Sequence, residues 1–340
     1  MSSDAAPVRV GVLGTGRIGR MHADLLSRRV PGASLTAVYD ASSERAQETA
    51  ARLGVPAAAG AAELLGSPEV DAIAICTNTD THVDAIVAAA ATGKAIFCEK
   101  PVSLDLAEVD RALAAVSRAG VLFQVGFNRR FDPAHQSVRE AVASGSIGDV
   151  QIVRISSRDP APPPLEYART SGGLFLDMTI HDFDMARYVT GSEVVEVFAR
   201  GAVRITPELE ELGDIDTAVV TLVHESGALT VIDNSRQAVY GYDQRVEAFG
   251  SLGMAASENP LSHTGLVRTV DGTRAATLPY FFLERYVPSY LAQWDAFVTA
   301  VNHRLPAAVG GADGRAPLVI GLAARRSLDE GRPVPVSEIG

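Results

Sequence analysis

Two carboxylates and a histidine stand among apolar residues in the segment GGLFLDMTIHDFDMARYV at 172–189. Spacings of four and three residues separate Asp177, His181 and Asp184, so a single helix would place all three on one face. Buried charges must be paired or shifted in pKa, and a capped helix start with a buried His–Asp pair is one interpretation. The other is catalytic, because an imidazole titrates near neutral pH and His181 could act as a general base oriented by carboxylates.

Lys100 belongs to the motif EKP at 99–101, which follows a short apolar run. A lysine at the end of a parallel strand faces the cleft where ligands bind, although many such lysines are ordinary surface residues. Oxidation of an alcohol requires a base for the hydroxyl proton while a hydride leaves the same carbon. A lysine can stabilise the developing alkoxide, and a nicotinamide performs the redox step.

The sequence GTGRIG at 14–19 matches the dinucleotide-binding pattern G-x-G-x-x-G between a predicted strand and a predicted helix. Asp40 ends the next predicted strand, where a carboxylate accepts hydrogen bonds from the ribose hydroxyls of NAD and repels the 2′-phosphate of NADP. Arg45 lies five residues further on and could accommodate a phosphate, so NADP is an alternative cofactor. The alternative without any cofactor is a glycine turn beside a solvated aspartate. The predicted cofactor contacts in this motif are Gly14, Thr15, Gly16, Arg17, Ile18, Gly19 and Asp40.

Further cofactor contacts are predicted where later strands end. The loop CTNTDTH at 76–82 lies at the carboxyl end of a strand, and it could equally be a polar loop in which Thr81 caps the next helix. The residues assigned to the cofactor from this loop and from EKP are Thr77, Asn78, His82, Glu99 and Lys100.

The elements that would position these residues fall into two groups. Before residue 126, apolar runs at 8–14, 34–40, 71–76, 94–100 and 121–127 alternate with helical patterns, which is typical of a doubly wound parallel sheet. After about residue 148 the strands alternate in polarity, with a hairpin turn at 225–227, which indicates a large open, mostly antiparallel sheet. We therefore expect an α/β protein with a Rossmann domain at 1–126 and a substrate-binding and oligomerisation domain at 127–340.

Composition excludes several other classes of protein. The 340 residues carry a formal net charge of −11, which disfavours nucleic acid and anionic membranes as partners. We find neither a signal peptide nor an apolar run of transmembrane length, and we expect a cytoplasmic protein. Cys76 and Cys98 end apolar runs and are expected as buried thiols. No Cys/His cluster has metal-ligand spacing, so no metal is expected.

Four segments together resemble the glucose–fructose oxidoreductase / inositol dehydrogenase / rhizopine catabolism (Gfo/Idh/MocA) family. They are GVLGTGRIGRMH near the start, CEKPVS at 98–103, GFNRRFD at 126–132 and GGLFLDMTIHDFDMARY at 172–188. The last two, with SRDPAPPP at 157–164 and DNSRQAVYGYDQRVEAFG at 233–250, are similar to inositol 2-dehydrogenases in particular. The resemblance covers essentially the whole chain.

The resemblance implies a Rossmann domain, an α/β domain with an open sheet, and a homotetramer in which the open sheets cover each other. It implies NAD-dependent oxidation of the polyol myo-inositol to 2-keto-myo-inositol (scyllo-inosose). It assigns catalysis to Lys100, Asp177 and His181, with His181 as the base, and a polyol or relay contact to Asp184. Asn128 and Arg129 either face the substrate or pair with a carboxylate at the domain joint. The pocket would also be lined by Asp159, Tyr240 and Tyr242.

Three other functions remain open at this stage. The chain could be an NAD-dependent dehydrogenase of another cyclitol or a pyranose, such as scyllo-inositol, chiro-inositol or glucose, because one scaffold accepts many polyols. It could be an NAD-dependent glycosidase, which oxidises, eliminates and re-reduces without net NADH. It could also be a non-catalytic NAD-binding regulator, in which His181 and Lys100 would be dispensable.

Overall fold

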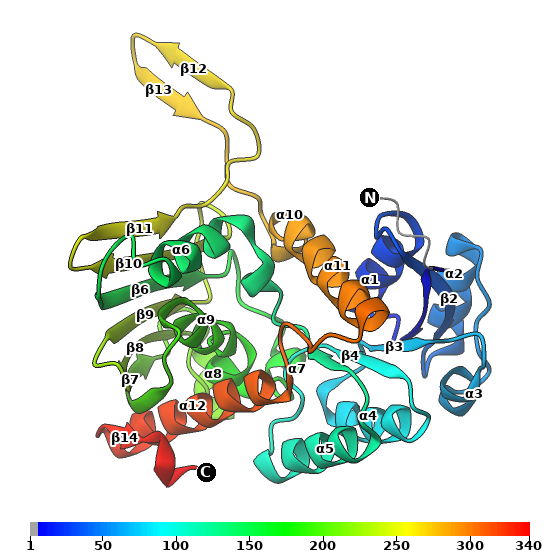
Figure 1. Cartoon of the computed structure of the whole chain (residues 1–340). Coiled ribbons are helices and arrows are strands. Elements are labelled where there is room, and N and C mark those ends of the chain that lie inside the picture. The colour runs from blue at the N-terminus through cyan, green and yellow to red at the C-terminus, as the bar shows by residue number, and fades with distance from the viewer. Residues whose placement is uncertain (1–5) are drawn as a thin grey trace. The chain divides into compact units, whose positions relative to one another are not determined.

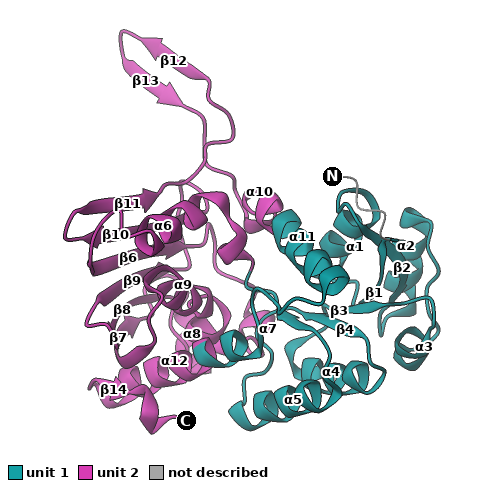
Figure 2. Cartoon of the chain, in the orientation of Figure 1, with its two compact units in different colours: residues 1–127, 290–316 teal, residues 128–289, 317–340 magenta. Residues whose placement is uncertain are grey.

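A computed structural model of the chain describes residues 6–340. The chain forms two compact units (Figure 2): unit 1 contains the residues up to Phe127 and Tyr290–Ala316, and unit 2 contains Asn128–Ser289 and Pro317–Gly340. The sequence-based division instead assigns 290–316 to the second domain. These residues group with unit 1 because Trp294, which is fully buried, packs against the rings of Phe97 and His22.

Unit 1 is built on a parallel sheet of five strands in the order β2-β1-β3-β4-β5. A single parallel bridge between Val38 and Ala57 adds a rudimentary strand beyond β2. The strand order reverses between β1 and β3, and in such sheets ligands bind at the carboxyl ends beside this point. The strands are β1 Val8–Leu13, β2 Ala33–Tyr39, β3 Ala72–Ile75, β4 Ala95–Cys98 and β5 Phe123–Val125.

Helices cover both faces of this sheet, with α1 and α2 on one side and α4 and α5 on the other (Figure 1). Every residue of β3 is buried, which explains the continuous apolar runs and confirms the predicted doubly wound sheet. Helix α5 begins at a capping aspartate, Asp105, and ends at the left-handed Gly120. The helical segments are α1 Arg17–Arg28, α2 Ser43–Leu53, α3 Ala61–Gly66, η1 Thr79–Thr81, α4 His82–Ala91 and α5 Leu106–Ala119.

Unit 2 contains a seven-stranded sheet in the order β11-β10-β6-β9-β8-β7-β14. Only the central pair β6–β9 is parallel, so the predicted mostly antiparallel sheet is confirmed, as is the hairpin at 225–227 that joins β8 to β9. The strands of this sheet are β6 Val150–Arg158, β7 Val194–Ala202, β8 Thr217–His224, β9 Leu229–Ser235, β10 Asp243–Gly250, β11 Gly253–Ser257 and β14 Val334–Pro335. A separate hairpin, β12 Leu266–Thr269 and β13 Gly272–Ala275, extends from this sheet (Figure 1).

One face of the larger sheet carries the core of unit 2, where Val220, Leu222 and Ile232 pack with Phe183 of α9. The opposite face exposes Val219, Leu229, Val231 and Phe249. The helical segments of unit 2 are η2 Asn128–Phe131, α6 Pro133–Ala143, α7 Leu165–Ala168, α8 Gly173–Asp177, α9 Ile180–Thr190, η3 Pro207–Leu212, α10 Phe282–Arg285 and η4 Val336–Glu338. Two helices contain a unit boundary, α11 Val287–His303 and α12 Gly311–Glu330.

The continuous helix predicted over 172–189 is wrong. Helix α8 ends at Asp177 and α9 begins at Ile180. The break occurs where the buried Thr179 hydroxyl donates to the Leu174 carbonyl and to Asn234 Oδ1, so side-chain bonds replace the regular ladder. Asp177 therefore lies on a different helix from His181 and Asp184. Within residues 6–340, no helix has the length and apolar character needed to cross a membrane.

Candidate active site

The glycines of 14–19 each have a distinct steric reason. Gly14 has φ +95°, and a Cβ there would lie 2.6 Å from the Cys76 carbonyl oxygen. A Cβ on Gly19 would lie 1.9 Å from the Gly14 carbonyl oxygen, whereas a Cβ on Gly16 would meet no described atom within 4 Å. Gly16 precedes α1, whose first amides point outward as anion donors. Tight turn, open approach and close packing are what a dinucleotide pyrophosphate requires, so these residues fit NAD.

Asp40 lies at the end of β2 and closes the same turn. Its Oδ2 accepts the Thr15 amide at 2.7 Å, and its Oδ1 accepts the Ser42 amide and the Arg45 guanidinium, each at 2.8 Å. Burial by itself would raise the pKa of Asp40, but Arg45 and the two amides outweigh it and hold the pKa below its usual value. Asp40 is thus an anion fixed beside the glycine turn, with the exposed Arg45 arm as its most easily displaced partner.

The loop after β3 contains a hydrogen-bonded group of threonines. Thr81 stands at the N-cap position of α4, but its hydroxyl lies 2.8 Å from both the Asn78 carbonyl oxygen, to which it donates, and Thr77 Oγ1, from which it can accept. The alternative in which Thr81 begins the helix is thus right about its position, but its side chain accepts no hydrogen bond from an amide of α4. Asn78 is exposed and Thr77 is half-buried, so both side chains border the carboxyl end of β3.

His82 connects this loop to the turn after β4. Its Nδ1 lies 2.8 Å from the Pro101 carbonyl oxygen and its Nε2 lies 3.1 Å from the Thr77 carbonyl oxygen. Burial lowers the pKa of His82, so the neutral ring donates through one nitrogen, best through the shorter contact with Pro101. Lys100, which precedes the cis Lys100–Pro101 bond, is half-buried, and its amide donates to Glu99 Oε2 at 3.3 Å.

In unit 2, Asp177 is held by two side chains. Its Oδ1 accepts the Tyr167 hydroxyl at 2.8 Å, and its Oδ2 accepts Arg236 Nη1 at 3.1 Å. The same Arg236 nitrogen lies 3.8 Å from Asp159 Oδ2. His181 follows on the first turn of α9 and is half-buried. The structure thus brings Asp159 and Asp177 together around one buried arginine.

Asp159 is the carboxylate of this group with a markedly altered acidity. The pKa of Asp159 is raised to about 6, because burial, together with the negative charge of Asp177, outweighs the opposing charge of Arg236. A carboxyl group with such a pKa changes charge within the range where histidines titrate. The group around Arg236 therefore contains a site whose charge depends on pH near neutrality.

Arg129 is committed to a buried ion pair. Its Nη1 donates to Asp182 Oδ1 at 2.6 Å, and its Nη2 lies 3.4 Å from the Tyr242 hydroxyl. Asp182 Oδ2 accepts the amide of Asn234 at 2.8 Å. Burial raises the pKa of Asp182, although Arg129 and Asn234 both favour its anion. Of the two alternatives for Arg129, pairing with a carboxylate is what the structure shows, and the carboxylate belongs to unit 2.

The other predicted polyol contacts are distributed over separate groups. Asp184, which is 1% exposed, accepts a bidentate pair of hydrogen bonds from Arg130. The buried Tyr242 lies against Arg129, and burial raises the pKa of its hydroxyl, which stays protonated. Tyr240 is half exposed and donates to Asp243 at 2.6 Å. Asn128 is buried, and within residues 6–340 its Nδ2 has no hydrogen-bond partner.

Two residues in this region were missed by the sequence reasoning. Asp182 was passed over because only the spacing of Asp177, His181 and Asp184 was considered. A usable signal was present, since two arginines in GFNRRFD face two aspartates in HDFD, and they form two buried pairs. Arg236 follows β9 in DNSRQ and gave no distinctive pattern, because its partners lie far away in sequence.

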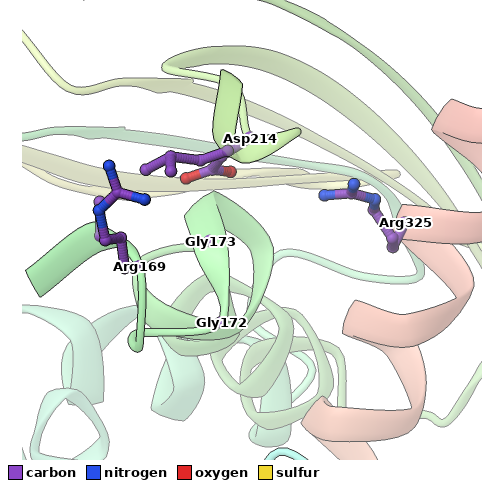
Figure 3. Close-up of a pocket in the computed structure, with 7 residues that line it drawn as sticks. Arg169, Gly172, Gly173, Asp214 and Arg325 are labelled. Carbon is purple, nitrogen blue, oxygen red and sulfur yellow. The ribbon is translucent and has the colours of Figure 1, made fainter. Parts of the chain in front are cut away.

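A cavity of about 380 Å³ lies elsewhere in unit 2, between α8, η3 and α12 (Figure 3). Arg169, Asp214 and Arg325 line it together with Ala168, Gly172, Gly173 and Leu212. Arg325 is engaged by the Gly213 carbonyl oxygen, and Asp214 Oδ1 accepts the Leu174 amide. None of the predicted site residues lines this cavity. Among residues 6–340, no group of three or more His, Cys, Asp or Glu side chains is arranged to hold a metal ion.

Comparison with known proteins gives matches over both halves of the chain. Residues 8–127 match the oxidoreductase family with an NAD-binding Rossmann fold, and residues 135–256 match the GFO/IDH/MocA C-terminal domain. The chain is 49% identical over 333 residues to the myo-inositol 2-dehydrogenase of Thermotoga maritima, covering 98% of this chain and 99% of that protein. It is 44% identical over 330 residues to the inositol 2-dehydrogenase of Rhizobium meliloti, covering 97% and 99%.

Solved structures agree with these matches. A crystal structure from Thermotoga maritima, described as that of a "probable dehydrogenase", superposes with a TM-score of 0.96 at 49% identity, over 98% of this chain and 100% of that chain. The scyllo-inositol dehydrogenase of Lactobacillus casei, solved with NAD(H) and scyllo-inositol, superposes with a TM-score of 0.91 at 28% identity, over 97% and 99%. The glycine turn and Asp40 fit the cofactor that the family description states. The chain therefore belongs to the GFO/IDH/MocA family of oxidoreductases, and its N-terminal Rossmann unit is the one that binds NAD.

Proposed function

We propose that the protein is an inositol 2-dehydrogenase, which oxidises the 2-hydroxyl of myo-inositol to the ketone of 2-keto-myo-inositol. The observation that carries the proposal is the full-length similarity to proteins named inositol 2-dehydrogenases. When bound, NAD accepts the hydride that leaves the carbinol carbon, and the hydroxyl proton goes to the protein. The reaction thus consumes one polyol and NAD and yields one ketone, NADH and a proton.

His181 is the proposed general base. The Asp177 carboxylate is fixed by Tyr167 and Arg236, four residues before His181 in the chain. A carboxylate held in this way can orient an imidazole and stabilise the imidazolium that forms when the ring takes the hydroxyl proton. Lys100 is proposed to donate a hydrogen bond to the oxygen as negative charge develops there.

Polar side chains of unit 2 suit a substrate rich in hydroxyl groups. Asp159, Arg236 and Tyr242 supply an acceptor, a donor and a group that can do both. Asn128 adds a buried amide with an unused donor among the described residues. A site that reads hydroxyls by hydrogen bonds rejects the wrong epimer strongly, because its own buried groups then lose their partners. We assign Asp159, Asn128, Tyr240, Tyr242 and Asp184 to the polyol pocket as proposals.

The test is NADH formation at 340 nm with myo-, scyllo- and chiro-inositol, glucose and xylose, each with NAD and with NADP. The proposal expects the highest kcat/KM with myo-inositol and NAD. A preference for scyllo-inositol would change the assigned substrate but leave the proposed mechanism intact. This outcome is included because the chain is similar to a scyllo-inositol dehydrogenase. Tight NAD binding without NADH formation from any polyol would overturn the proposal in favour of a glycosidase or a regulator.

We further propose a homotetramer in which the open faces of the larger sheets cover each other. Val219, Val231 and Phe249 expose 51%, 37% and 45% of their surface on this face. The β12–β13 hairpin is exposed at every residue, and an isolated two-stranded hairpin is marginally stable in water, so a neighbouring subunit would stabilise it. Light scattering of the wild type and of Val231→Glu tests this: a tetramer that Val231→Glu splits is expected, and a monomeric wild type would refute it.

A cytoplasmic location is proposed on the chemistry of the two cysteines. Cys76 and Cys98 are both buried thiols, and burial raises the pKa of each well above its usual value, so neither thiol ionises readily. Such thiols persist in a reducing compartment.

A further inference from the structure

Three side chains far apart in sequence form a buried hydrogen-bond chain inside unit 1. The Trp294 indole nitrogen lies 2.9 Å from His22 Nδ1, and His22 Nε2 lies 2.7 Å from Glu99 Oε1. Trp294 and His22 are completely buried and Glu99 is 8% exposed. His22 comes from α1, Glu99 from the end of β4 and Trp294 from α11, so three separate elements meet at this chain.

The donors and acceptors of this chain fix the protonation of His22. An indole nitrogen only donates, so His22 Nδ1 must accept and cannot carry a proton. The ring proton therefore resides on Nε2, which donates to Glu99 Oε1. A protonated imidazole would direct a second N–H at the indole N–H. His22 is thus a neutral ring with one possible tautomer, and Glu99 acts purely as an acceptor.

Aromatic rings lock the imidazole in this orientation. Phe97, Tyr290 and Trp294 approach the His22 ring edge-to-face, with centroids at 5.3, 5.5 and 5.6 Å. Edge-to-face packing fixes the ring plane, and a ring flip would break both hydrogen bonds. The direction in which His22 presents its Nε2 proton is therefore set by the core of unit 1.

The Glu99 carboxylate, which accepts this hydrogen bond, also contacts the backbone of the next residue in the EKP motif. Its Oε2 is 3.3 Å from the Lys100 amide nitrogen, and a Cβ on Gly126 would lie 3.0 Å from the carboxylate. The Glu99 amide donates to the Ile75 carbonyl oxygen of β3. The carboxylate is thus enclosed between the ends of β3, β4 and β5, with one oxygen bound by His22 and the other by the Lys100 backbone.

We propose that Trp294 and His22 are positioning residues for Lys100: they hold the Glu99 carboxylate against the Lys100 amide and so set where the Lys100 side chain leaves the strand. This inference rests on the proposed function, in which Lys100 contacts the reacting oxygen. Misplacement of a catalytic group by about 1 Å can cost about 100-fold in rate, so a remote chain that fixes one amide can matter for turnover.

The composition of the chain makes this inference directly measurable. The sequence contains a single tryptophan, Trp294, and two lysines, Lys94 and Lys100. Labelling with ¹⁵N-tryptophan gives one indole signal, and labelling with ¹⁵N-lysine gives two backbone amide signals. Lys94 serves as the internal reference, because its ammonium group binds the carbonyl oxygens of Ser67 and Val70, away from this chain.

The variants are His22→Gln, His22→Leu, Trp294→Phe and Phe297→Leu. Glutamine can accept from the indole and donate to Glu99, so His22→Gln is the conservative rescue, while leucine removes both bonds. Phe297 is fully buried and packs edge-to-face against Trp294 and Phe97 with an apolar ring that forms no hydrogen bond, so Phe297→Leu is the control for lost packing. All four variants are compared by NAD affinity, NMR signals and the kcat and KM for inositol oxidation.

We expect His22→Leu and Trp294→Phe to move the Lys100 amide signal and to leave Lys94 unchanged. In both, kcat should fall about 10-fold to 100-fold with NAD affinity kept, and His22→Gln should restore most of the loss. In ¹⁵N-histidine spectra of the wild type, His22 should show the Nε2–H tautomer.

Opposite results would overturn the inference. An unmoved Lys100 amide in His22→Leu, an Nδ1–H tautomer in the wild type, or an equal loss of kcat in Phe297→Leu would each do so. The NMR readouts need no substrate, so they test the positioning even if the wild type oxidises none of the polyols. Failure of the proposed function and failure of this inference are therefore distinguishable.

Discussion

The cofactor site of unit 1 and the Arg236 group of unit 2 are built in different ways. In unit 1, the predicted contacts are the glycine turn and polar side chains at the ends of parallel strands, and Asp40 bonds to Thr15, Ser42 and Arg45 within 25 residues. In unit 2, Arg236 joins Asp177 and Asp159 across 59 residues or more, and Arg129 reaches Asp182 across 53.

Because of this difference, mutations should affect different properties in the two sites. In the cofactor site of unit 1, removing one polar side chain should lower the affinity for NAD, while the backbone groups of the site and the fold remain. A site made of buried ion pairs shares its residues with the core, so removing one partner leaves an uncompensated charge and destabilises the unit. Binding defects should therefore dominate in unit 1, and stability defects should dominate in unit 2.

The largest effect is expected at His181, for which we propose a chemical role as the general base. His181→Ala should lower kcat for inositol oxidation by about 10²–10⁴-fold, which is the usual contribution of a general base. NAD affinity, measured by titration, should stay within a factor of two to three of the wild type. A variant with normal turnover would remove His181 from the role of base.

Replacing Arg129 tests whether the buried ion pairs of unit 2 also stabilise its fold. Arg129→Met should lower the free energy of unfolding by about 3–5 kcal/mol, because Asp182 would be left buried without its partner. The control is Arg154→Met, which loses an exposed pair with Glu247 and should cost under about 1 kcal/mol. Denaturant unfolding measures the free energy of unfolding of both variants. Equal losses in the two variants would contradict the proposed difference between the two units.

Asp40 tests the opposite expectation for unit 1. Asp40→Ala should weaken NAD about 10-fold to 100-fold, the value of one or two hydrogen bonds to a charged group, and should relax discrimination against NADP. Asp80→Ala, at an exposed position in the loop after β3, is the control and should bind NAD normally. An unchanged preference for NAD over NADP would take Asp40 out of the ribose site.

The smallest effect concerns the pH dependence of stability in unit 2. The pKa of His135 is lowered to about 4, because burial, together with the positive charges of Arg285 and Arg129, outweighs the opposing charge of Asp132. The folded state then binds fewer protons than the unfolded state between about pH 6.5 and 4, so stability present above pH 6.5 is lost as the pH falls. The loss should be about 1–3 kcal/mol.

The comparison of wild type with His135→Gln across this pH range isolates the contribution of His135. Asp159 acts in the opposite direction, because its pKa of about 6 lies above the unfolded value and its protonation stabilises the fold as the pH falls. Parallel stability curves for wild type and His135→Gln would show that His135 does not titrate as its surroundings indicate.

Sequence reasoning succeeded where structure is decided locally. The five apolar runs, the glycine turn at 14–19 and Asp40 follow from strand periodicity and from steric limits within one βαβ unit. The alternating strands of unit 2 and the turn at 225–227 follow in the same way. It failed at 172–189, where helical propensity favoured one helix and the buried hydroxyl of Thr179 ended it by bonding to Leu174 and Asn234.

What the sequence alone determined is the family, the cofactor unit and the types of residue available for chemistry, because these depend on short motifs and on residues close together in the chain. Only the tertiary structure decided which charges meet. Asp182, Arg236 and Trp294, which bind Arg129, Asp177 and His22 respectively, lie 53, 59 and 272 residues away from them in the chain. Pairs of this kind depend on how distant elements pack, and hydrophobic periodicity, which reports only which face of an element is buried, does not encode the partner.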